Sequence, residues 1–233
     1  MTAAKDLLRW TLPDPDELDR SRRGSMRPLP PVVLTRTPVR MDLEEYLVLE
    51  ERSEHKHEYV DGIVYAMAGA SDAHVSITQA LTSRLLPLVR AKGCRVYSMD
   101  MALEVYDRSD SERLSARFYP DVIVTCSEAD KSRRNAKREP SILIEVLSDS
   151  SDSTAKHDRS RKLEHYLAIP SLLQYWLVSQ DRRKIEIYHR DGDDWRFLHY
   201  ESLDDAVMFA SLGAGISLRE IYEDVLFESI RSK

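Results

Sequence analysis

Two short apolar stretches, each containing one acidic residue, place the tightest constraint on how this chain can fold. They are residues 119–125 (Tyr-Pro-Asp-Val-Ile-Val-Thr) and residues 141–147 (Ser-Ile-Leu-Ile-Glu-Val-Leu). Both are rich in β-branched residues and bounded by turn-forming residues, which predicts two buried β-strands. An ionised carboxylate in a buried strand is costly unless it is paired or bound to a metal ion. Asp121 and Glu145 are therefore candidates for a functional site.

The two strands can bring these acids together. Side chains alternate along a strand, so Asp121 shares a face with Ile123, and Glu145 shares a face with Leu143. If the strands are neighbours in register, the two carboxylates converge on one cation, and such hard oxygen ligands suit Mg²⁺ or Mn²⁺. Taken singly, an acid at a strand end is more often a turn residue, and a strand Glu more often lies on a solvated edge. Their joint occurrence favours a metal site.

Composition narrows the class of protein. The chain has 233 residues, 42% of them hydrophobic, which predicts one globular domain with or without an appendage. No apolar run approaches the length of a membrane span, and the N-terminus lacks a signal-peptide core, so a cytoplasmic protein without a membrane partner is expected. Cys94 and Cys126 are predicted to be two separate buried thiols. The net charge of −6 argues against a protein whose whole surface is basic and binds nucleic acid, but it allows a local basic groove.

The first 38 residues differ from the rest. They contain six of the ten prolines and show no hydrophobic period. We therefore expect residues 1–38 to form a disordered, proline-rich leader, and residues 39–228 to form the folded domain.

Periodicity within the domain predicts a mixed α/β architecture. Helices are expected at 41–50, 71–92 (kinked or ended early by Pro87), 154–169 and from Ser217 onward. Strands are expected at 95–106, 118–125, 141–147, 173–178, 184–188 and 195–200, with a polar loop at 107–117. Residues 57–67 form a hairpin through Asp61-Gly62, with Glu58 as a third strand acid. The order predicts a central mixed sheet flanked by helices.

A basic segment connects the two acidic strands. It contains five positive charges and no acid, on Lys131, Arg133, Arg134, Lys137 and Arg138. Such a run is usually a solvated loop. Its position between Asp121 and Glu145 also makes it a candidate contact for phosphates. His74, near the start of the second helix, is by its position more typical of a surface or capping residue than of a ligand.

The ordered set of motifs resembles a known family. Tyr119-Pro120-Asp121 followed by Ile144-Glu145-Val146-Leu147-Ser148 resembles the PD-(D/E)XK nuclease superfamily. Further matches narrow the resemblance to the Uma-two family of restriction-endonuclease-like proteins; they are Glu58-Tyr59-Val60-Asp61-Gly62, His74, Asp158, Lys162, Tyr166, Ile169-Pro170-Ser171 and Tyr175-Trp176-Leu177-Val178. The similarity covers roughly Met41 to Val225.

The resemblance implies a restriction-endonuclease-like core and a hydrolase that cleaves phosphodiester bonds of DNA with Mg²⁺ or Mn²⁺. Asp121 and Glu145 match the metal-binding acids, and Glu58 matches the acid of the first hairpin. The superfamily lysine would stand two residues after the Glu, where this chain has Leu147. Lys162 matches the lysine that the following helix supplies in this family, and His74, Asp158 and Tyr166 are accessory candidates.

Two alternatives stay open on the sequence, beside an expectation about the oligomeric state. The chain could be a catalytically inactive module that binds nucleic acid or protein through the same fold. It could hydrolyse RNA or another phosphodiester instead of DNA. Homodimerisation is expected if the protein cuts both strands of a duplex, since two cuts require two sites.

Overall fold

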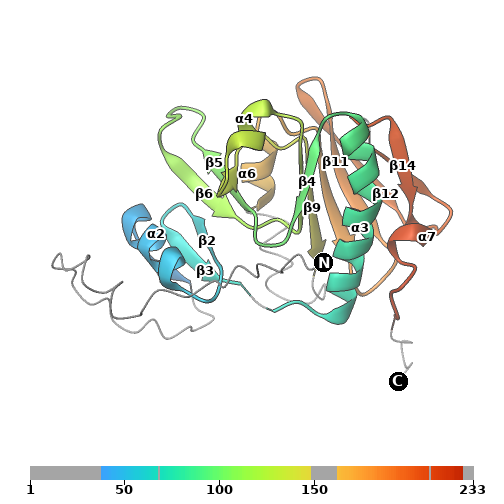
Figure 1. The fold of residues 1–233 in the computed structure, drawn as a ribbon, viewed down its shortest axis with the longest axis horizontal. Helices are drawn as coiled ribbons and strands as arrows, with labels where there is room; N and C mark the ends of the chain where they lie inside the picture. Colours follow the sequence, from blue (N-terminus) through green and yellow to red (C-terminus); the bar gives the residue numbers. More distant parts are fainter. Residues whose placement is uncertain (1–37, 68, 148–161, 210, 228–233) are drawn as a thin grey trace, which may run out of the picture. The chain divides into compact units, whose positions relative to one another are not determined.

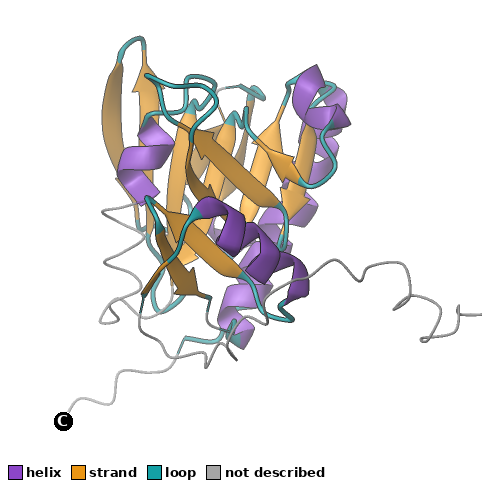
Figure 2. Ribbon diagram, turned by 90° about the vertical axis from the view of Figure 1, so that its left-hand side faces the viewer, coloured by secondary structure: helices purple, strands orange, loops and turns teal. Residues whose placement is uncertain are grey.

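The computed structural model describes residues 38–67, 69–147, 162–209 and 211–227. These residues all belong to the compact unit that begins at Thr35. Within the described residues, the strands form two six-stranded sheets and one two-stranded sheet (Figure 1). Figure 2 shows these strands with the helices packed around them. The mixed α/β class that the sequence predicts is confirmed.

The first sheet has the strand order β1-β3-β2-β6-β5-β8. Its strands are β1 (Val39–Arg40), β2 (His57–Val60), β3 (Ile63–Ala66), β5 (Ala102–Tyr106), β6 (Leu114–Phe118) and β8 (Ala136–Lys137). β2 and β3 form the predicted hairpin, in which Asp61 and Gly62 take the positive φ values of 48° and 83° that a tight turn needs.

The second sheet has the order β12-β11-β10-β9-β7-β4. Its strands are β4 (Arg95–Ser98), β7 (Val122–Thr125), β9 (Ile142–Leu147), β10 (Gln174–Ser179), β11 (Ile185–Asp191) and β12 (Asp194–Tyr200). β7 and β9 are antiparallel neighbours, and β9 and β10 are parallel. The two acidic strands of the sequence are thus both central strands of one sheet.

The described helices are α2 (Leu43–Arg52), α3 (Asp72–Ala91), α4 (Glu128–Ser132), α6 (Leu163–Leu167) and α7 (Leu218–Ile221). The capping boxes Asp42–Glu45 and Ser217–Glu220 start α2 and α7, as their sequences indicate. Pro87 lies inside α3 but neither ends it nor shortens it, because the helix continues to Ala91.

The central strands of the second sheet, β7, β9 and β10, are buried on both faces. One face packs against α3, α7 and the two-stranded sheet of β13 (Ala206–Phe209) and β14 (Ala214–Ser217), and Trp176 stacks on Phe209 at 4.3 Å. The other face packs against α6 and the first sheet, and Ile123, Leu143 and Tyr166 lie in this second core. Asp121 and Glu145 therefore lie on strands between two hydrophobic layers.

Two predicted boundaries are wrong. Residues 95–106 form two strands in different sheets, because the chain turns at Met99, whose φ is 58°. No glycine or proline marks that turn. Residues 114–117 belong to strand β6 and not to a polar loop, since Leu114 and Ala116 are buried on alternate positions. The hairpin of β13 and β14 was not predicted.

The cysteines also differ from the prediction. Cys94 and Cys126 form a disulfide, with their Cα atoms 4.1 Å apart. They extend the antiparallel register of β4 and β7 by one residue beyond the Arg95–Thr125 pair. Cross-strand neighbours of this kind approach closely enough for a disulfide, a proximity that the separation of 32 residues conceals in the sequence.

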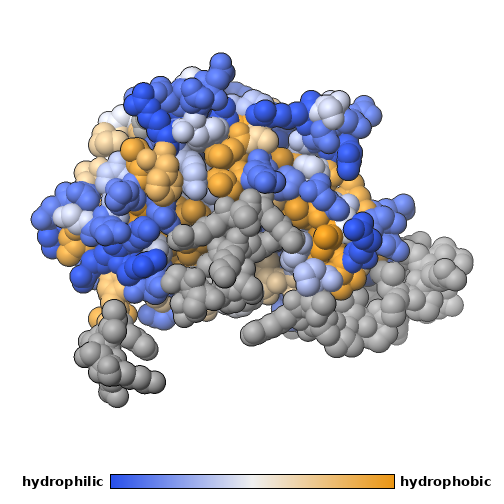
Figure 3. Space-filling model, turned by 180° about the vertical axis from the view of Figure 1, so that it is seen from behind, coloured by the Kyte–Doolittle hydropathy of each residue, from blue (hydrophilic) through white to orange (hydrophobic). Residues whose placement is uncertain are grey.

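The described surface is mostly hydrophilic. Seen from behind, hydrophobic side chains form separate patches between hydrophilic ones (Figure 3). Met99, Phe197 and Met208 are among the exposed large hydrophobic side chains. In the part of the chain that the structure describes, no helix has the length and apolar character required to cross a membrane.

Candidate active site

The two strand acids face each other across the second sheet. Val122 pairs with Ile144 in the register of β7 and β9, and extending this register by one residue sets Asp121 opposite Glu145. Directly opposed side chains have Cβ atoms about 5 Å apart. The strand register thus makes Asp121 and Glu145 cross-strand neighbours, as the sequence analysis expected for strands in register.

Both carboxylate oxygens of Asp121 accept a hydrogen bond. The backbone N–H of Val146 donates to Oδ2 at 2.7 Å, and Nε2 of His74 lies 2.7 Å from Oδ1. The side chains of Asp121 and His74 are both 19% exposed. His74 belongs to the first turn of α3, so a helix on one face of the sheet orients an acid at the start of β7.

Glu145 lies in a buried cluster with a lysine. Nζ of Lys162 lies 3.1 Å from Oε1 of Glu145 and 2.8 Å from Oε1 of Glu58. The three side chains are between 5% and 7% exposed. Glu58 comes from β2 of the first sheet, so Lys162 connects acids from both sheets. The structure therefore places Glu58, Glu145 and Lys162 in one cluster, with Asp121 opposite Glu145.

Tyr166 adds a hydrogen bond to the same oxygen. Its hydroxyl donates to Oε1 of Glu145 at 2.8 Å. Burial, reinforced by the negative charge of Glu145, raises the pKa of Tyr166 well above its usual value. The hydroxyl accordingly remains protonated and continues to donate at any physiological pH. Lys162 and Tyr166 share a helical face, as their spacing of four residues predicts. Asp158, the third member of that series, lies outside the described residues.

A second buried network holds the residues that precede Glu58 and Asp121 in the sequence. The sequence pattern did not indicate it. The hydroxyl of Tyr119 donates to Oε1 of Glu50 at 2.7 Å, and the backbone N–H of His57 donates to Oε2 at 3.1 Å. Burial and the Glu50 hydrogen bond raise the pKa of Tyr119 to about 12. Glu50 lies on α2, at a position that in the sequence looks like an ordinary exposed helix residue.

The donor chemistry of the acids suits a hard divalent cation. Across the described residues, no group of three or more His, Cys, Asp or Glu side chains has the arrangement of a metal site. Mg²⁺ is commonly bound by one or two carboxylates together with waters and substrate phosphates, so it does not require a third protein ligand. Asp121 and Glu145 fit that pattern.

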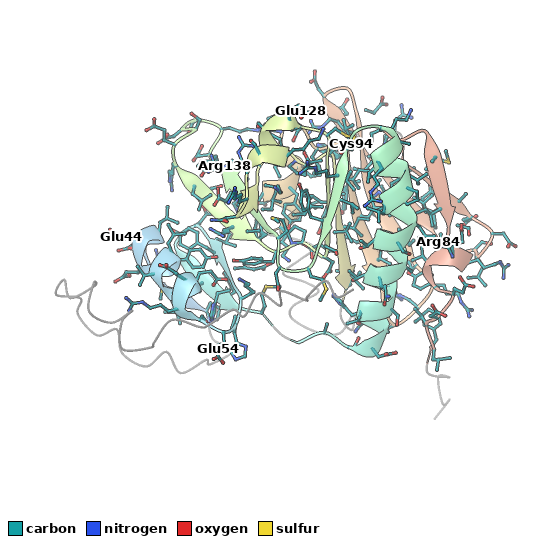
Figure 4. The ribbon with its side chains drawn as sticks, in the orientation of Figure 1. Glu44, Glu54, Arg84, Cys94, Glu128 and Arg138 are labelled. Atoms are coloured by element: carbon teal, nitrogen blue, oxygen red, sulfur yellow. A yellow bond between two sulfur atoms is a disulfide. The ribbon has the colours of Figure 1, made fainter. Side chains whose placement is uncertain are left out.

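The basic segment is not an open positive surface. Nζ of Lys131 lies 2.6 Å from the Glu128 carboxylate, and Arg138 lies 2.8 Å from Glu104 (Glu128 and Arg138 are labelled in Figure 4). Acids that lie outside the run in sequence therefore neutralise two of its five cations.

Two further cations of this segment have structural contacts. Arg133 lies 2.6 Å from the buried Asp130, and Nζ of Lys137 is buried, donates to the Asp130 carbonyl at 2.7 Å and lies over the ring of Tyr97. Arg134 is exposed. The segment thus stabilises its own fold through most of its charge.

The first part of the segment, in α4, also lies away from the acids. β7 runs from the Asp121 end to Thr125, and α4 follows at the far end, where Ser141 leads into β9. Figure 1 shows α4 at one end of the sheet and the arrowhead of β9 at the other, where α3 begins. The structure therefore separates the α4 part of the segment from Asp121 and Glu145, whereas Ala136 of β8 packs against Tyr119.

Comparisons with known proteins identify a matching family model and similar sequences. Residues 43–219 match the model of a family described as "Uma2: Putative restriction endonuclease". Two proteins of Synechocystis sp. (strain ATCC 27184 / PCC 6803 / Kazusa) are similar in sequence. The uncharacterized protein slr1290 is 32% identical over 185 residues, covering 79% of this chain and 92% of that protein. The uncharacterized protein sll1609 is 37% identical over 153 residues, covering 64% and 80% respectively.

A solved structure shares the fold. The crystal structure of a protein from Anabaena variabilis ATCC 29413, described as "a putative nuclease belonging to DUF820", superposes with a TM-score of 0.61. It covers 78% of this chain and 98% of that chain at 18% sequence identity. At this identity the match shows a common fold.

Proposed function

Because the chain belongs to the Uma2 family of restriction-endonuclease-like proteins, we propose that it is a Mg²⁺- or Mn²⁺-dependent endonuclease that hydrolyses phosphodiester bonds of DNA. Asp121 and Glu145 bind the metal ion, Lys162 is the catalytic cation, and Glu58 completes the acidic cluster. The observation that supports this proposal most strongly is the position of Lys162, whose ammonium lies between Glu58 and Glu145.

Each residue has a defined task in this proposal. When bound, the divalent ion supplies positive charge that offsets the charge developing on the phosphate oxygens. The Val146 N–H and His74 fix the orientation of the Asp121 carboxylate. The Tyr166 hydroxyl does the same for Glu145. Lys162 orients the attacking water or stabilises the charge that the phosphate gains in the transition state.

One feature favours the alternative of an inactive module that binds nucleic acid or protein. Leu147 occupies the position two residues after Glu145. The Lys162 ammonium is in contact with two carboxylates, so a purely structural ion-pair role would also explain its burial.

Activity and metal binding separate the two functions. The purified protein is incubated with plasmid DNA and single-stranded DNA, with and without Mn²⁺, beside the variants Asp121→Asn and Glu145→Gln. We expect Mn²⁺-dependent cleavage by the parent and none by either variant. We also expect a severe loss of Mn²⁺ affinity in calorimetry, because removing one of two carboxylates leaves too few hard ligands. Unchanged Mn²⁺ affinity in both variants would identify the acids as structural and end the nuclease proposal.

Four further properties belong to the same proposal. The substrate is DNA, and RNA in the same assay serves as the competitor. The protein acts as a homodimer, because cutting two strands requires two sites. It acts in the cytoplasm, and residues 1–38 are a leader outside the nuclease domain of residues 39–228.

A further inference from the structure

A short basic turn lies at the same end of the second sheet as the acids. It joins β10 to β11 and contains Asp181, Arg182, Arg183 and Lys184. Glu145 pairs with Leu177 of β10, and β10 continues only to Ser179, about 7 Å further along the strand. The turn therefore begins one short step beyond the acid cluster.

A chain of hydrogen bonds crosses this end of the sheet from the acids to the turn. Nε2 of His74 lies 2.7 Å from Asp121, and the His74 backbone N–H donates to Ser71 Oγ at 3.2 Å. Ser71 Oγ in turn donates to Gln180 Oε1 at 2.7 Å. The Gln180 N–H donates to the Leu147 carbonyl at 3.3 Å. His74 and Ser71, at the start of α3, therefore connect the Asp121 carboxylate to Gln180, at the start of the basic turn.

The backbone of the turn is held in one conformation. The Tyr222 hydroxyl donates to the carbonyls of Ser179 and Lys184 at 3.0 and 2.9 Å, and it accepts from the Lys184 N–H at 3.3 Å. Burial raises the pKa of Tyr222, so this hydroxyl remains a donor. A turn fixed in this way presents its side chains with little loss of conformational freedom on binding.

Two of the turn's cations are available to an anion. Arg182 and Arg183 are exposed, and across the described residues neither forms an ion pair with an acid. Arg183 lies over the ring of Phe227 at 5.0 Å, and Lys184 is paired with Glu186 at 3.1 Å. Asp181 offsets part of the charge of the turn. In the Lys131–Arg138 segment, by contrast, carboxylates lie within 3 Å of three of the five cations.

We infer that Arg182 and Arg183 bind backbone phosphates of the nucleic acid whose scissile bond lies at Asp121 and Glu145. The inference rests on the proposed function and identifies which side of the site the substrate occupies. The occupant is a nucleic-acid backbone because exposed guanidinium groups pair with phosphates, and because the β10–β11 turn lies at the end of the second sheet that carries acids suited to phosphodiester chemistry. The strand passes over the start of α3 and the β10–β11 turn, away from α4.

Binding without cleavage tests this inference. A fluorescein-labelled 30-base-pair DNA duplex is titrated in EDTA at several salt concentrations, with the full chain and with Arg182→Ala/Arg183→Ala. We expect an affinity loss of about tenfold or more, and a salt slope smaller by about two, because each phosphate contact contributes about −0.9 to that slope. Arg113→Ala/Arg219→Ala, which removes the same charge from two exposed ion pairs elsewhere, should retain the parental salt slope.

The rival path is tested in the same way with Lys131→Ala/Arg134→Ala. If this variant loses the affinity and slope instead, the substrate lies at the α4 end and the inference is wrong. It is equally wrong if polyglutamate competes as well as DNA, which would make the turn a general polyanion surface. Binding that needs Arg182 and Arg183 but is never followed by cleavage would uphold the phosphate contacts and refute the nuclease. If Arg182→Ala/Arg183→Ala cleaves DNA at the parental rate, the nuclease proposal stands and the phosphate contacts of Arg182 and Arg183 are refuted.

Discussion

At the scale of single residues, the most informative group is Lys162. Its ammonium contacts Glu58 from the first sheet and Glu145 from the second, and it supplies positive charge to both buried carboxylates. Removing one partner of a buried ion pair is far more costly than replacing both. Lys162 is therefore expected to contribute to stability as well as to catalysis, and the two effects need separate measurements.

Lys162→Ala should lower the rate of Mn²⁺-dependent DNA cleavage by about 10²-fold or more, the scale of losing one transition-state charge stabiliser. Mn²⁺ affinity should persist, since an ammonium is not a ligand, and saturating Mn²⁺ should recover part of the lost thermal stability. Single-turnover cleavage and calorimetry measure the two quantities.

The control is Lys56→Ala, since Lys56 also lies near a buried carboxylate, 3.9 Å from Glu50, but outside the site. The Lys56→Ala variant should cleave DNA at the parental rate. If Lys162→Ala also cuts at that rate, Lys162 is a structural counterion and has no part in the chemistry.

How far the site could be predicted depends on the kind of signal each residue carries. Asp121 and Glu145 are detectable because a charge in an apolar strand contradicts the local pattern. In the sequence, Lys162 looks like an ordinary surface residue of a helix, and only the family resemblance identifies it as a site residue. Glu50 and Gln180 carry no local signal, since their partners Tyr119 and Ser71 are 69 and 109 residues away.

At the scale of helices and strands, prediction succeeded where the signal is local. The capping boxes of α2 and α7 and the Asp61-Gly62 turn consist of neighbouring residues. It failed at Met99, where tertiary packing imposes a left-handed turn on a residue that normally avoids one. The ion pairs of the Lys131–Arg138 segment were not visible in the sequence for a related reason, since an acid such as Glu104, 34 residues from Arg138, neutralises part of its charge.

The disulfide gives a prediction at this scale. It joins the chain across a separation of 32 residues. Cys94→Ser/Cys126→Ser should therefore lower the free energy of unfolding by about 2–4 kcal/mol, as the loss of a cross-link over such a loop implies. Urea unfolding with and without dithiothreitol measures the effect.

The serine variant is its own control, because dithiothreitol should leave it unchanged. Two titratable thiols in the untreated parent, with no effect of dithiothreitol, would restore the prediction of separate cysteines. Such bonds are uncommon in the cytosol, so thiol titration of freshly lysed cells also tests the proposed cytoplasmic location.

At the scale of the whole molecule, the proposed boundary near residue 38 can be tested by truncation. A chain that begins at Val39 retains β1, which pairs with β3. We expect its melting temperature to lie within about 5 °C of the full chain, a difference on the order of 1 kcal/mol. Differential scanning calorimetry provides the measurement.

A chain that begins at Leu43 is the matched comparison. It additionally lacks β1 and the helix cap Asp42, whose loss alone costs about 1 kcal/mol. It should therefore melt clearly lower than the chain that begins at Val39. Insolubility of the chain that begins at Val39 would contradict the proposed boundary.

The distribution of the site along the chain has a consequence for the order in which a cell makes it. Glu58 and Asp121 leave the ribosome early, Glu145 and Lys162 follow, and β10, which pairs with Glu145's strand, ends only at Ser179. Since synthesis proceeds from the N-terminus, a growing chain has no complete acid–lysine cluster until nearly four-fifths of it has been made. A translation product interrupted before Lys162 would carry the acids without the lysine, so under the proposed function it would lack the catalytic centre.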